Sequence, residues 1–466
     1  MKNIFWKRER IEIMTALALF NYVFLGAEYL FDNMMAFQTD SGGVVLAQSY
    51  VLGSSTVGFL LFGVLDGKLR ERAKKAGSAG AGVLAAVCLW VIQVHQSYES
   101  TLAAGLILYV LLGIAGSLVH YRAACRYGME EHLAETVGVS YATGLFLQFL
   151  ENNLIHNAAV EAVILAVAFW VLLFLVEKRK VAGSLMERNL YESDPIRHPY
   201  AAAVTLIFTV ALMTCIFATL DNAVTLGHAG GSMDIGQWPR LILAVSGLVS
   251  GVLFDYGKGR YRNLIMYCVT LLSTVCILVI VSGGSFLLGL IVFYLSAGFF
   301  VVFFSTGFVR LAGYMRVPQF WAGMGRAVNN LCAILIGNFS VALIRSSDST
   351  KIMIASIGLF VLISIAIYIY TVMGQTEVEL PDQERKQEEE QDYFSAFADT
   401  YALTEREQEV LKMLLASDEE VQEIANRLYI SRAMLYRYIS SLNKKTDTNS
   451  RIGLIQFYYT WKPEKG

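Results

Sequence analysis

Long apolar stretches separated by short polar segments fill the first 375 residues of the chain. Twelve of these stretches reach about 20 residues, the length that a helix needs to cross a bilayer core roughly 30 Å thick. They lie near 11–31, 44–65, 77–94, 101–120, 137–156, 158–176, 200–220, 238–254, 263–282, 284–305, 319–344 and 352–373. The pattern predicts an all-α, 12-span membrane domain over 1–375.

Residues 376–466 have a different composition. They hold 12 of the 37 Lys and Arg residues and 18 of the 39 Asp and Glu residues. The whole chain is 55% hydrophobic and 16% charged, whereas a soluble globular protein carries about 25% charged residues. This composition excludes a conventional soluble enzyme, and the net charge of −2 averages two unlike parts.

The basic residues between the apolar stretches predict the orientation in the membrane. If the N-terminus is cytoplasmic, the inner segments carry 21 Lys and Arg residues and the outer segments carry three. Basic loops stay on the cytoplasmic side. We therefore expect a multi-pass protein of the inner (cytoplasmic) membrane with both termini in the cytoplasm, where DNA is found.

A shift of 189 residues aligns polar and glycine positions of the chain with one another. Asp32 meets Asp221, Asp66 meets Asp255, and three further matches are Asn33 with Asn222, Gln48 with Gln237 and Gly58 with Gly247. The repeat predicts two six-helix halves, at about 1–180 and 198–375, in parallel orientation. For Asp32 and Asp221 the repetition favours a shared structural cap over contact with a ligand.

Two loops carry a recognisable motif. The chain reads GVLDGKLRER at 63–72 and GVLFDYGKGRYR at 251–262. Both resemble the loop signature G-x-x-x-D-R/K-x-G-R/K of the major facilitator superfamily, although Gly63 lies one residue too close to Asp66 and Tyr256 replaces a basic residue. The resemblance implies the facilitator fold over 1–375, with a central cavity between the halves.

The resemblance also implies a gating role for Asp66 and Asp255. A carboxylate beside a sharp turn can face the N-terminal dipole of a neighbouring helix in one conformation and leave it in another. Arg326 is expected to pair with Asp66 across the inner interface. The alternative is that both aspartates only cap turns.

Charged residues inside apolar stretches predict the ligand site, because each is expensive to bury in a bilayer. In the resembled fold, the first, fifth, seventh, eighth and eleventh helices line the cavity. The candidate ligand-binding residues on these helices are Glu28, Glu151, Arg240, Tyr22 and Trp238. Glu28 has no counterpart in the repeat, where Phe217 stands, which favours a functional role. The acidic rim would suit a cationic or hydroxyl-rich small molecule.

An acidic segment at 376–400 follows the last apolar stretch. Eight acidic residues lie between 377 and 392, against Arg385 and Lys386. Such a segment is typical of a solvated linker. The alternative is that it covers a basic surface of the tail.

Residues 401–466 predict four short helices. Thr404 and Glu407 form a capping box before a helix whose Val410, Leu411 and Leu414 share one face. A second helix spans about 417–428, Ser431 caps a third, and a fourth runs from about 449 to 461. A tight turn between the second and third helices is typical of a helix-turn-helix.

This tail resembles the LuxR-type DNA-binding domain. The matching residues are LTEREQEVL (403–411), EIANRLYIS (423–431), Lys445 and Arg451. The resemblance implies that the third helix enters the major groove, with Tyr436, Arg437 and Ser440 near bases. The complete set of candidate DNA-binding residues is Ser431, Arg432, Tyr436, Arg437, Tyr438, Ser440 and Lys444.

The tail departs from the LuxR pattern at several positions. Met434 replaces the usual threonine and Tyr438 the usual histidine. Between 427 and 451, six basic residues still face one acidic residue, so attraction to phosphates is retained. The apolar surface of the last helix suits a homodimer on a two-fold operator. The alternative is a four-helix tail that binds protein.

Together these features predict a membrane-embedded, one-component transcriptional regulator. A facilitator-like domain would sense a small molecule, and the LuxR-type helix-turn-helix would bind double-stranded promoter DNA. The alternative is a secondary transporter of the facilitator type whose tail regulates its own expression. We find no nucleotide-binding loop, metal cluster or nucleophile–base pair, and therefore expect no catalytic residue, metal or cofactor.

Overall fold

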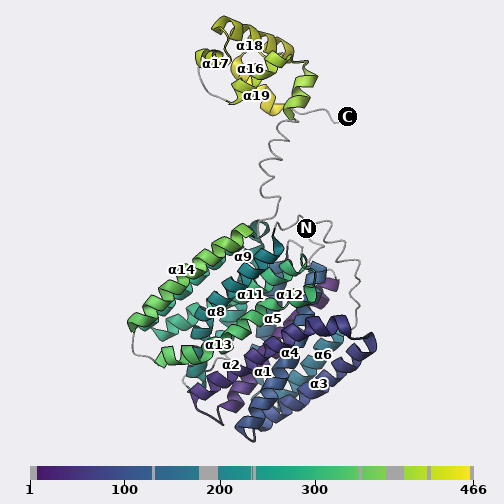
Figure 1. The fold of residues 1–466 in the computed structure, drawn as a ribbon, viewed down its shortest axis with the longest axis vertical. Helices are drawn as coiled ribbons and strands as arrows, with labels where there is room; N and C mark the ends of the chain where they lie inside the picture. Colours follow the sequence, from purple (N-terminus) through teal and green to yellow (C-terminus); the bar gives the residue numbers. More distant parts are fainter. Residues whose placement is uncertain are drawn as a thin grey trace. The chain divides into compact units, whose positions relative to one another are not determined.

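The computed structural model describes residues 8–127, 132–177, 198–231, 234, 238–345, 349–373, 393–416 and 421–461. The chain divides into two compact units, 1–375 and 376–466 (Figure 1). The acidic run at 377–392, the basic residues of 1–7 and 178–197, and Gln237 lie outside the described residues.

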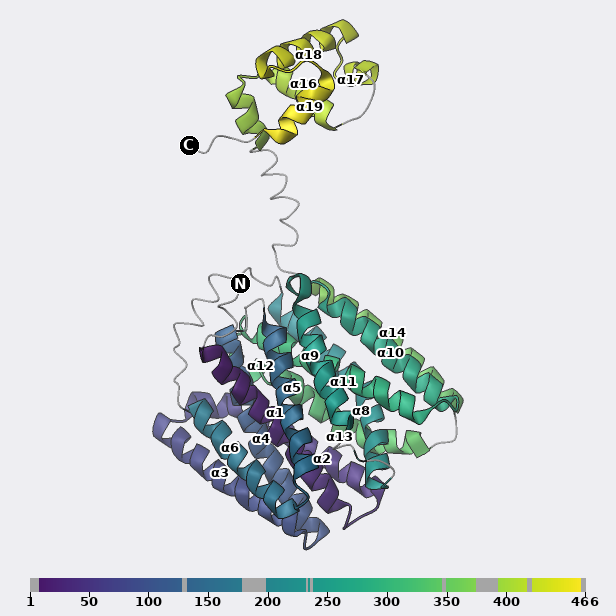
Figure 2. The same cartoon turned by 180° about the vertical axis from the view of Figure 1, so that it is seen from behind.

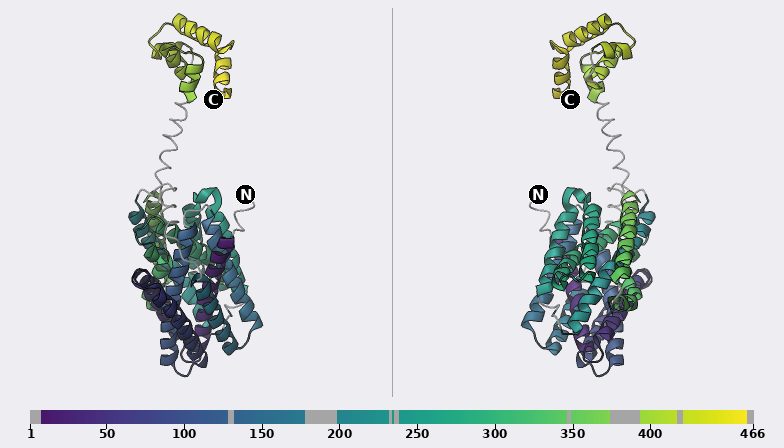
Figure 3. Two further views of the ribbon diagram at one scale, coloured as in Figure 1. Left: turned by 90° about the vertical axis from the view of Figure 1, so that its right-hand side faces the viewer. Right: turned by 90° about the vertical axis from the view of Figure 1, so that its left-hand side faces the viewer.

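Helices make up the first unit. Their bounds are α1 (Arg8–Met35), α2 (Ser41–Lys68), α3 (Glu71–Val94), α4 (Tyr98–Tyr127), α5 (Leu133–Leu154), α6 (Ala158–Glu177), α8 (Pro199–Ala229), α9 (Trp238–Asp255), the 3₁₀ helix η1 (Tyr256–Gly259), α10 (Arg262–Val281), α11 (Phe286–Ala312), α12 (Pro318–Trp321), α13 (Met324–Arg345) and α14 (Ser349–Met373). They run alongside one another as a bundle (Figure 3).

Each apolar stretch that the sequence predicts coincides with one helix, except the eleventh, which is divided between two. Among the described residues, ten helices are long and apolar enough to cross a membrane. The helices α5 and α13 fall short because glutamine, asparagine and charged side chains lower their hydropathy. The chain is therefore a multi-pass membrane protein.

The eleventh stretch, expected as one helix over 319–344, is divided. The short α12 ends at Trp321, and α13 begins at Met324. A Cβ on Gly323 would lie 2.8 Å from the Phe59 ring of α2. The break thus lets the chain pass close to α2.

The two sets of helices, α1–α6 and α8–α14, contact each other most extensively through two pairs, α5 with α9 and α2 with α13. The α5–α9 pair is visible from behind (Figure 2). Glycines allow its backbones to approach: a Cβ on Gly138 would lie 2.8 Å from the Cα of Gly251. Small residues at such crossings are the usual means of close helix packing in membranes.

The second unit contains α16 (Glu405–Ala416), α17 (Val421–Arg427), α18 (Arg432–Thr446) and α19 (Arg451–Thr460). A further helix covers 393–400. These helices surround a separate core that includes Leu411, Ile424, Leu435, Leu442 and Leu454.

The helix at 393–400 corrects the expected linker, which reached residue 400. Phe394, Phe397 and Ala398 are buried in the core of the second unit. The Phe397 ring lies 5.1 Å from that of Tyr458 and 5.2 Å from that of Trp461. Aromatic residues follow directly after the last acidic residue of the run, so hydrophobic burial draws this segment into the domain.

Candidate nucleic-acid interface and candidate membrane site

The start of α16 is fixed by the capping box expected from the sequence. The Thr404 backbone N–H donates to Glu407 Oε2 at 2.8 Å, and the Glu407 N–H donates to Thr404 Oγ1 at 3.4 Å. The two residues therefore satisfy free backbone donors at the helix start.

Glu407 also joins α16 to α18. Its carboxylate accepts hydrogen bonds from Ser441 and Lys445, each at 2.7 Å, and the side chain is almost fully buried. Burial alone would raise the pKa of Glu407, but the hydrogen bonds from Lys445, Ser441 and Thr404 outweigh it and lower the pKa to about 2. The carboxylate is therefore charged at neutral pH.

The turn between α17 and α18 orients the third helix. The Ile430 N–H donates to the Ala425 carbonyl at 3.0 Å, and Tyr429 between them has φ +54° and is 96% exposed. Ser431 then caps α18 by accepting from the Met434 N–H at 3.3 Å. Such a turn ends one helix and starts the next within four residues.

The outer face of α18 carries most of the candidate DNA-binding residues. The exposed members are Ser431, Arg432, Tyr436, Arg437, Ser440 and Lys444. The Arg432 guanidinium lies over the Tyr436 ring, 5.6 Å from its centroid. Leu435, Ile439 and Leu442 point into the core. This division leaves one polar, basic face of the helix open.

Tyr438 differs from the other candidates. It is half-buried and packs against the core, since it stands three residues after Leu435 and four before Leu442 on the inner side of α18. The hydrogen-bond partners of Glu407 on α18 were also not predicted from the sequence. Ser441 and Lys445 lie 34 and 38 residues away from it, and no local pattern links them.

In the membrane unit, Glu28 lies at the interface of the two halves. Its Oε1 accepts a hydrogen bond from Gln48 Nε2 of α2 at 2.7 Å. It also interacts electrostatically with Arg240 of α9 and Arg326 of α13, which are both buried. The structure thus brings together the predicted residues Glu28 and Arg240.

Two further carboxylates belong to this cluster. Asp32 of α1 interacts with Glu28, with Asp221 of α8 and with Arg240. We refer to Glu28, Asp32, Asp221 and Arg240 as the central charge cluster. Both halves supply its residues, so its electrostatic balance depends on how the halves are placed.

Glu151 and Tyr22 form a separate group. Tyr22 of α1 interacts with Glu151 of α5, and both lie in the field of Glu161 of α6, which the sequence analysis did not select. The position of this glutamate inside the apolar stretch 158–176 could have identified it as a candidate site residue. Trp238 is 41% exposed at the first position of α9.

The expected pairing of Arg326 with Asp66 is wrong. Arg326 donates to Asn21 Oδ1 at 3.0 Å, and its guanidinium lies 5.6 Å from the ring centroids of Phe24 and Phe304. Arg326 sits inside the bundle on α13, where aromatic faces and an amide are within reach.

Asp66, near the end of α2, and Asp255, the last residue of α9, occupy corresponding positions but have different partners. Asp66 pairs with Lys74 at 2.7 Å and accepts from Gln319 of the second half at 3.5 Å. Asp255 accepts from the Glu135 backbone N–H at 2.7 Å, at the N-terminus of α5 in the first half. Each aspartate therefore bridges the halves, and Asp255 faces a helix dipole.

A hydrogen-bonded chain of small polar residues also joins the halves. Asn330 donates to Ser55 of α2 at 2.8 Å, Asn329 donates to Asn330 at 3.1 Å, and Thr214 of α8 donates to Asn329 at 3.2 Å. These bonds connect α2, α13 and α8 within the bundle.

Comparison with known proteins matches both units. Residues 401–458 match the family of bacterial regulatory proteins, luxR family. None of the curated proteins matches the chain. The second unit therefore contains a LuxR-type helix-turn-helix domain.

Three solved structures share the fold of the membrane unit. A Major Facilitator Superfamily transporter, FucP, in the outward conformation is 14% identical with a TM-score of 0.53, over 79% of this chain and 99% of that chain. The human organic anion transporter MFSD10 is 16% identical with a TM-score of 0.51, over 79% and 100%. A variant of the E. coli fucose:proton symporter FucP is 13% identical with a TM-score of 0.52, over 79% and 98%. The membrane unit therefore has the facilitator fold.

Proposed function

We propose that this chain is a membrane-embedded, one-component transcriptional regulator. Residues 1–375 sense a small molecule, and the LuxR-type domain at 401–466 binds double-stranded promoter DNA. The observation that carries the proposal is the exposed basic face of α18 in a domain that shares a chain with a facilitator-type membrane unit.

The chemistry of this face fits the major groove of DNA. Arg437 can donate two hydrogen bonds to a guanine. Tyr436 directly precedes it, and Ser440 lies about one turn farther along the exposed face of α18. Lys444, farther along α18, suits a phosphate. The Ser431 hydroxyl already caps the helix, so its contribution to DNA binding is to position α18.

A homodimer through α19 would place two such faces on a two-fold operator. Ile452 and Tyr459 are 68% and 67% exposed and stand seven residues, two helical turns, apart. An apolar stripe of this kind suits an isologous contact. The basic inner segments counted in the sequence support a cytoplasmic position of the tail at the inner membrane.

The central charge cluster is the proposed site of sensing. A ligand shifts the conformation of the halves only if it binds one arrangement more tightly than another. Glu28, Asp32 and Asp221 outnumber the two nearby guanidinium groups of Arg240 and Arg326, so a cationic or hydroxyl-rich small molecule fits this site. Asp66 and Asp255 are the proposed gating residues, because each contacts the opposite half.

Chromatin immunoprecipitation of the tagged full-length chain tests the DNA-binding proposal. We expect Arg437→Ala to reduce promoter occupancy about tenfold or more, because a base-reading arginine contributes roughly 1–3 kcal/mol. The matched control is Arg406→Ala, an exposed arginine of α16 that pairs with Glu409. Equal occupancy for Arg437→Ala and the native chain would contradict the proposal. Solute uptake without any promoter occupancy would favour a transporter instead.

A further inference from the structure

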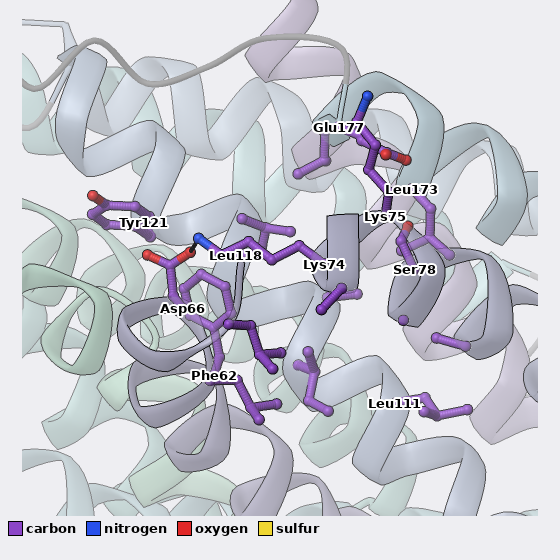
Figure 4. Close-up of a pocket in the computed structure, with 18 of the residues that line it drawn as sticks. Phe62, Asp66, Lys74, Lys75, Ser78, Leu111, Leu118, Tyr121, Leu173 and Glu177 are labelled. Atoms are coloured by element: carbon purple, nitrogen blue, oxygen red, sulfur yellow. Dashed lines mark hydrogen bonds and ion pairs between the residues drawn. The ribbon is translucent and has the colours of Figure 1, made fainter. Parts of the chain in front are cut away.

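A cavity of about 620 Å³ lies within the first half of the membrane unit, away from the central charge cluster. It lies among α2, α3, α4 and α6, and most of its lining residues are apolar (Figure 4). Phe62, Leu111, Leu118 and Leu173 are among the wall residues. Its volume lies within the roughly 300–1,000 Å³ of small-molecule sites.

The small residues of α3 create this space. Gly77, Ser78 and Ala81 line the cavity. A Cβ added to Gly77 would meet no atom within 4 Å, and the same holds for Gly80, which does not line the cavity. The two glycines therefore make a matched pair: both accept a side chain, but only one projects it into the lining.

One end of the cavity is charged. Lys74 and Lys75 of α3, Arg122 of α4, Asp66 of α2 and Glu177 of α6 line it, all near the helix ends on the side that we propose faces the cytoplasm. Lys74 and Asp66 form an ion pair within the lining of the cavity (Figure 4). Three basic side chains thus face two acidic ones.

Arg122 has unused hydrogen-bonding capacity in this setting. Its Nε is buried and has no hydrogen-bond partner among the described residues. An unsatisfied buried donor costs free energy, and an anionic oxygen inside the cavity would supply the missing acceptor.

We propose that this cavity binds an anionic amphiphile: a carboxylate or phosphate head between Arg122 and Lys75, with a hydrocarbon chain along Phe62, Leu111 and Leu118. Basic pockets between transmembrane helices on the cytoplasmic side are suited to acidic lipid heads. Leu84 lines the cavity and is 43% exposed on α3, so the mouth adjoins the surface that faces lipid. A soluble anion would leave the apolar walls unfilled.

Photo-crosslinking to the purified full-length chain tests this proposal. The probes are a diazirine-bearing palmitate, a diazirine-bearing phosphatidylglycerol and, as a cationic control, a diazirine-bearing alkylamine. Peptide mass spectrometry locates the adducts. We expect labelling on α2, α3 and α4, and about tenfold less of it in Gly77→Leu and in Arg122→Gln. Two control variants should be labelled as strongly as the native chain. They are Gly80→Leu and Arg72→Gln; Arg72 is an exposed basic residue of α3 that does not line the cavity.

The probes also distinguish the source of the amphiphile. Labelling by palmitate alone indicates a free fatty acid, and labelling by phosphatidylglycerol alone indicates a membrane phospholipid; both support the proposal. Equal labelling of Gly77→Leu and Gly80→Leu, equal labelling by the alkylamine, or none by either anionic probe overturns it. Because Arg122→Gln and Arg72→Gln form a second pair, the test stands even if Gly77→Leu fails to fold. Crosslinking requires no DNA binding, so its result is independent of the proposed regulatory function.

Discussion

At the scale of single residues, Glu407 is the connection on which the helix-turn-helix depends most. It closes the capping box of α16 and holds Ser441 and Lys445 of α18. Since α18 carries the proposed DNA-reading side chains, Glu407 links the stability of the domain to the placement of that face.

We expect Glu407→Gln to lower the free energy of unfolding of a 376–466 fragment by about 1–3 kcal/mol at pH 7, because hydrogen bonds to a charged group are lost. The pKa of Glu407 falls from 4.5 to about 2 on folding. Its stabilisation is therefore present above pH 4.5 and disappears as the pH falls toward 2. Urea denaturation of the native and Glu407→Gln fragments at several pH values measures this difference in the free energy of unfolding.

The control for this prediction is Glu409→Gln. Glu409 pairs with Arg406 on the exposed side of α16, where an ion pair contributes about 0–1 kcal/mol. A difference between the native fragment and Glu407→Gln that persists unchanged at pH 2 would show that the stabilisation does not come from the charge.

Residue-level prediction from the sequence succeeded where partners are local. The capping box of Thr404 and Glu407 and the cap by Ser431 were predicted because their partners lie three residues away. The pairing of Arg326 with Asp66 failed, because it depended on packing across the halves that no spacing encodes. The partners Asn21 and Phe304 of Arg326 became visible only in the structure.

At the scale of elements, the length of the apolar stretches predicts where helices form, and glycines determine where two helices approach closely. The helices α5 and α9 touch through Gly138, Gly247 and Gly251. A Cβ on Gly138 would lie 2.5 Å from the Gly247 carbonyl oxygen, and backbone atoms cannot rotate away as a side chain can. This crossing therefore sets how closely the two halves approach.

We expect Gly138→Val to separate α5 from α9 and shift the halves away from the arrangement described above. Overpacking of this kind costs about 1–3 kcal/mol, enough to move a two-state equilibrium about tenfold. Spin labels at Lys68, the exposed last residue of α2, and at Tyr256, the exposed first residue of η1, should report a longer distance between the halves.

Gly80→Val is the matched control, since a Cβ at Gly80 meets no atom within 4 Å. The same label distance in Gly138→Val and Gly80→Val would show that the α5–α9 crossing does not limit the approach of the halves.

The elements that were not predicted correctly from the sequence depend on contacts between residues far apart in the chain. The break before α13 follows from the contact of Gly323 with Phe59, 264 residues earlier in the chain. The helix at 393–400 was assigned to the linker because the acidic run dominates the composition of 376–400. Its Phe397 packs against Tyr458 and Trp461, which lie more than 60 residues later in the chain.

At the scale of the whole molecule, a regulator of this design requires coupling between the central charge cluster and the LuxR-type domain. Both halves contribute to the cluster, so a change at the cluster alters the balance between arrangements of the halves. Coupling is then a difference in binding free energy between those arrangements. It can be changed without touching either the DNA-binding face or membrane insertion.

We expect Glu28→Gln to change the coupling between the central charge cluster and the LuxR-type domain. The amide keeps a hydrogen-bonding partner for Gln48 but removes the charge that faces Arg240 and Arg326. In a growth condition that alters promoter occupancy by the native chain, we expect the variant to require a different inducer concentration, with maximal occupancy unchanged. Glu99→Gln, an exposed glutamate in the first turn of α4, is the control and should follow the native dose–response curve. Superimposable curves for Glu28→Gln and the native chain would place sensing outside the cluster, whereas loss of all occupancy would mean that Glu28 supports folding rather than sensing.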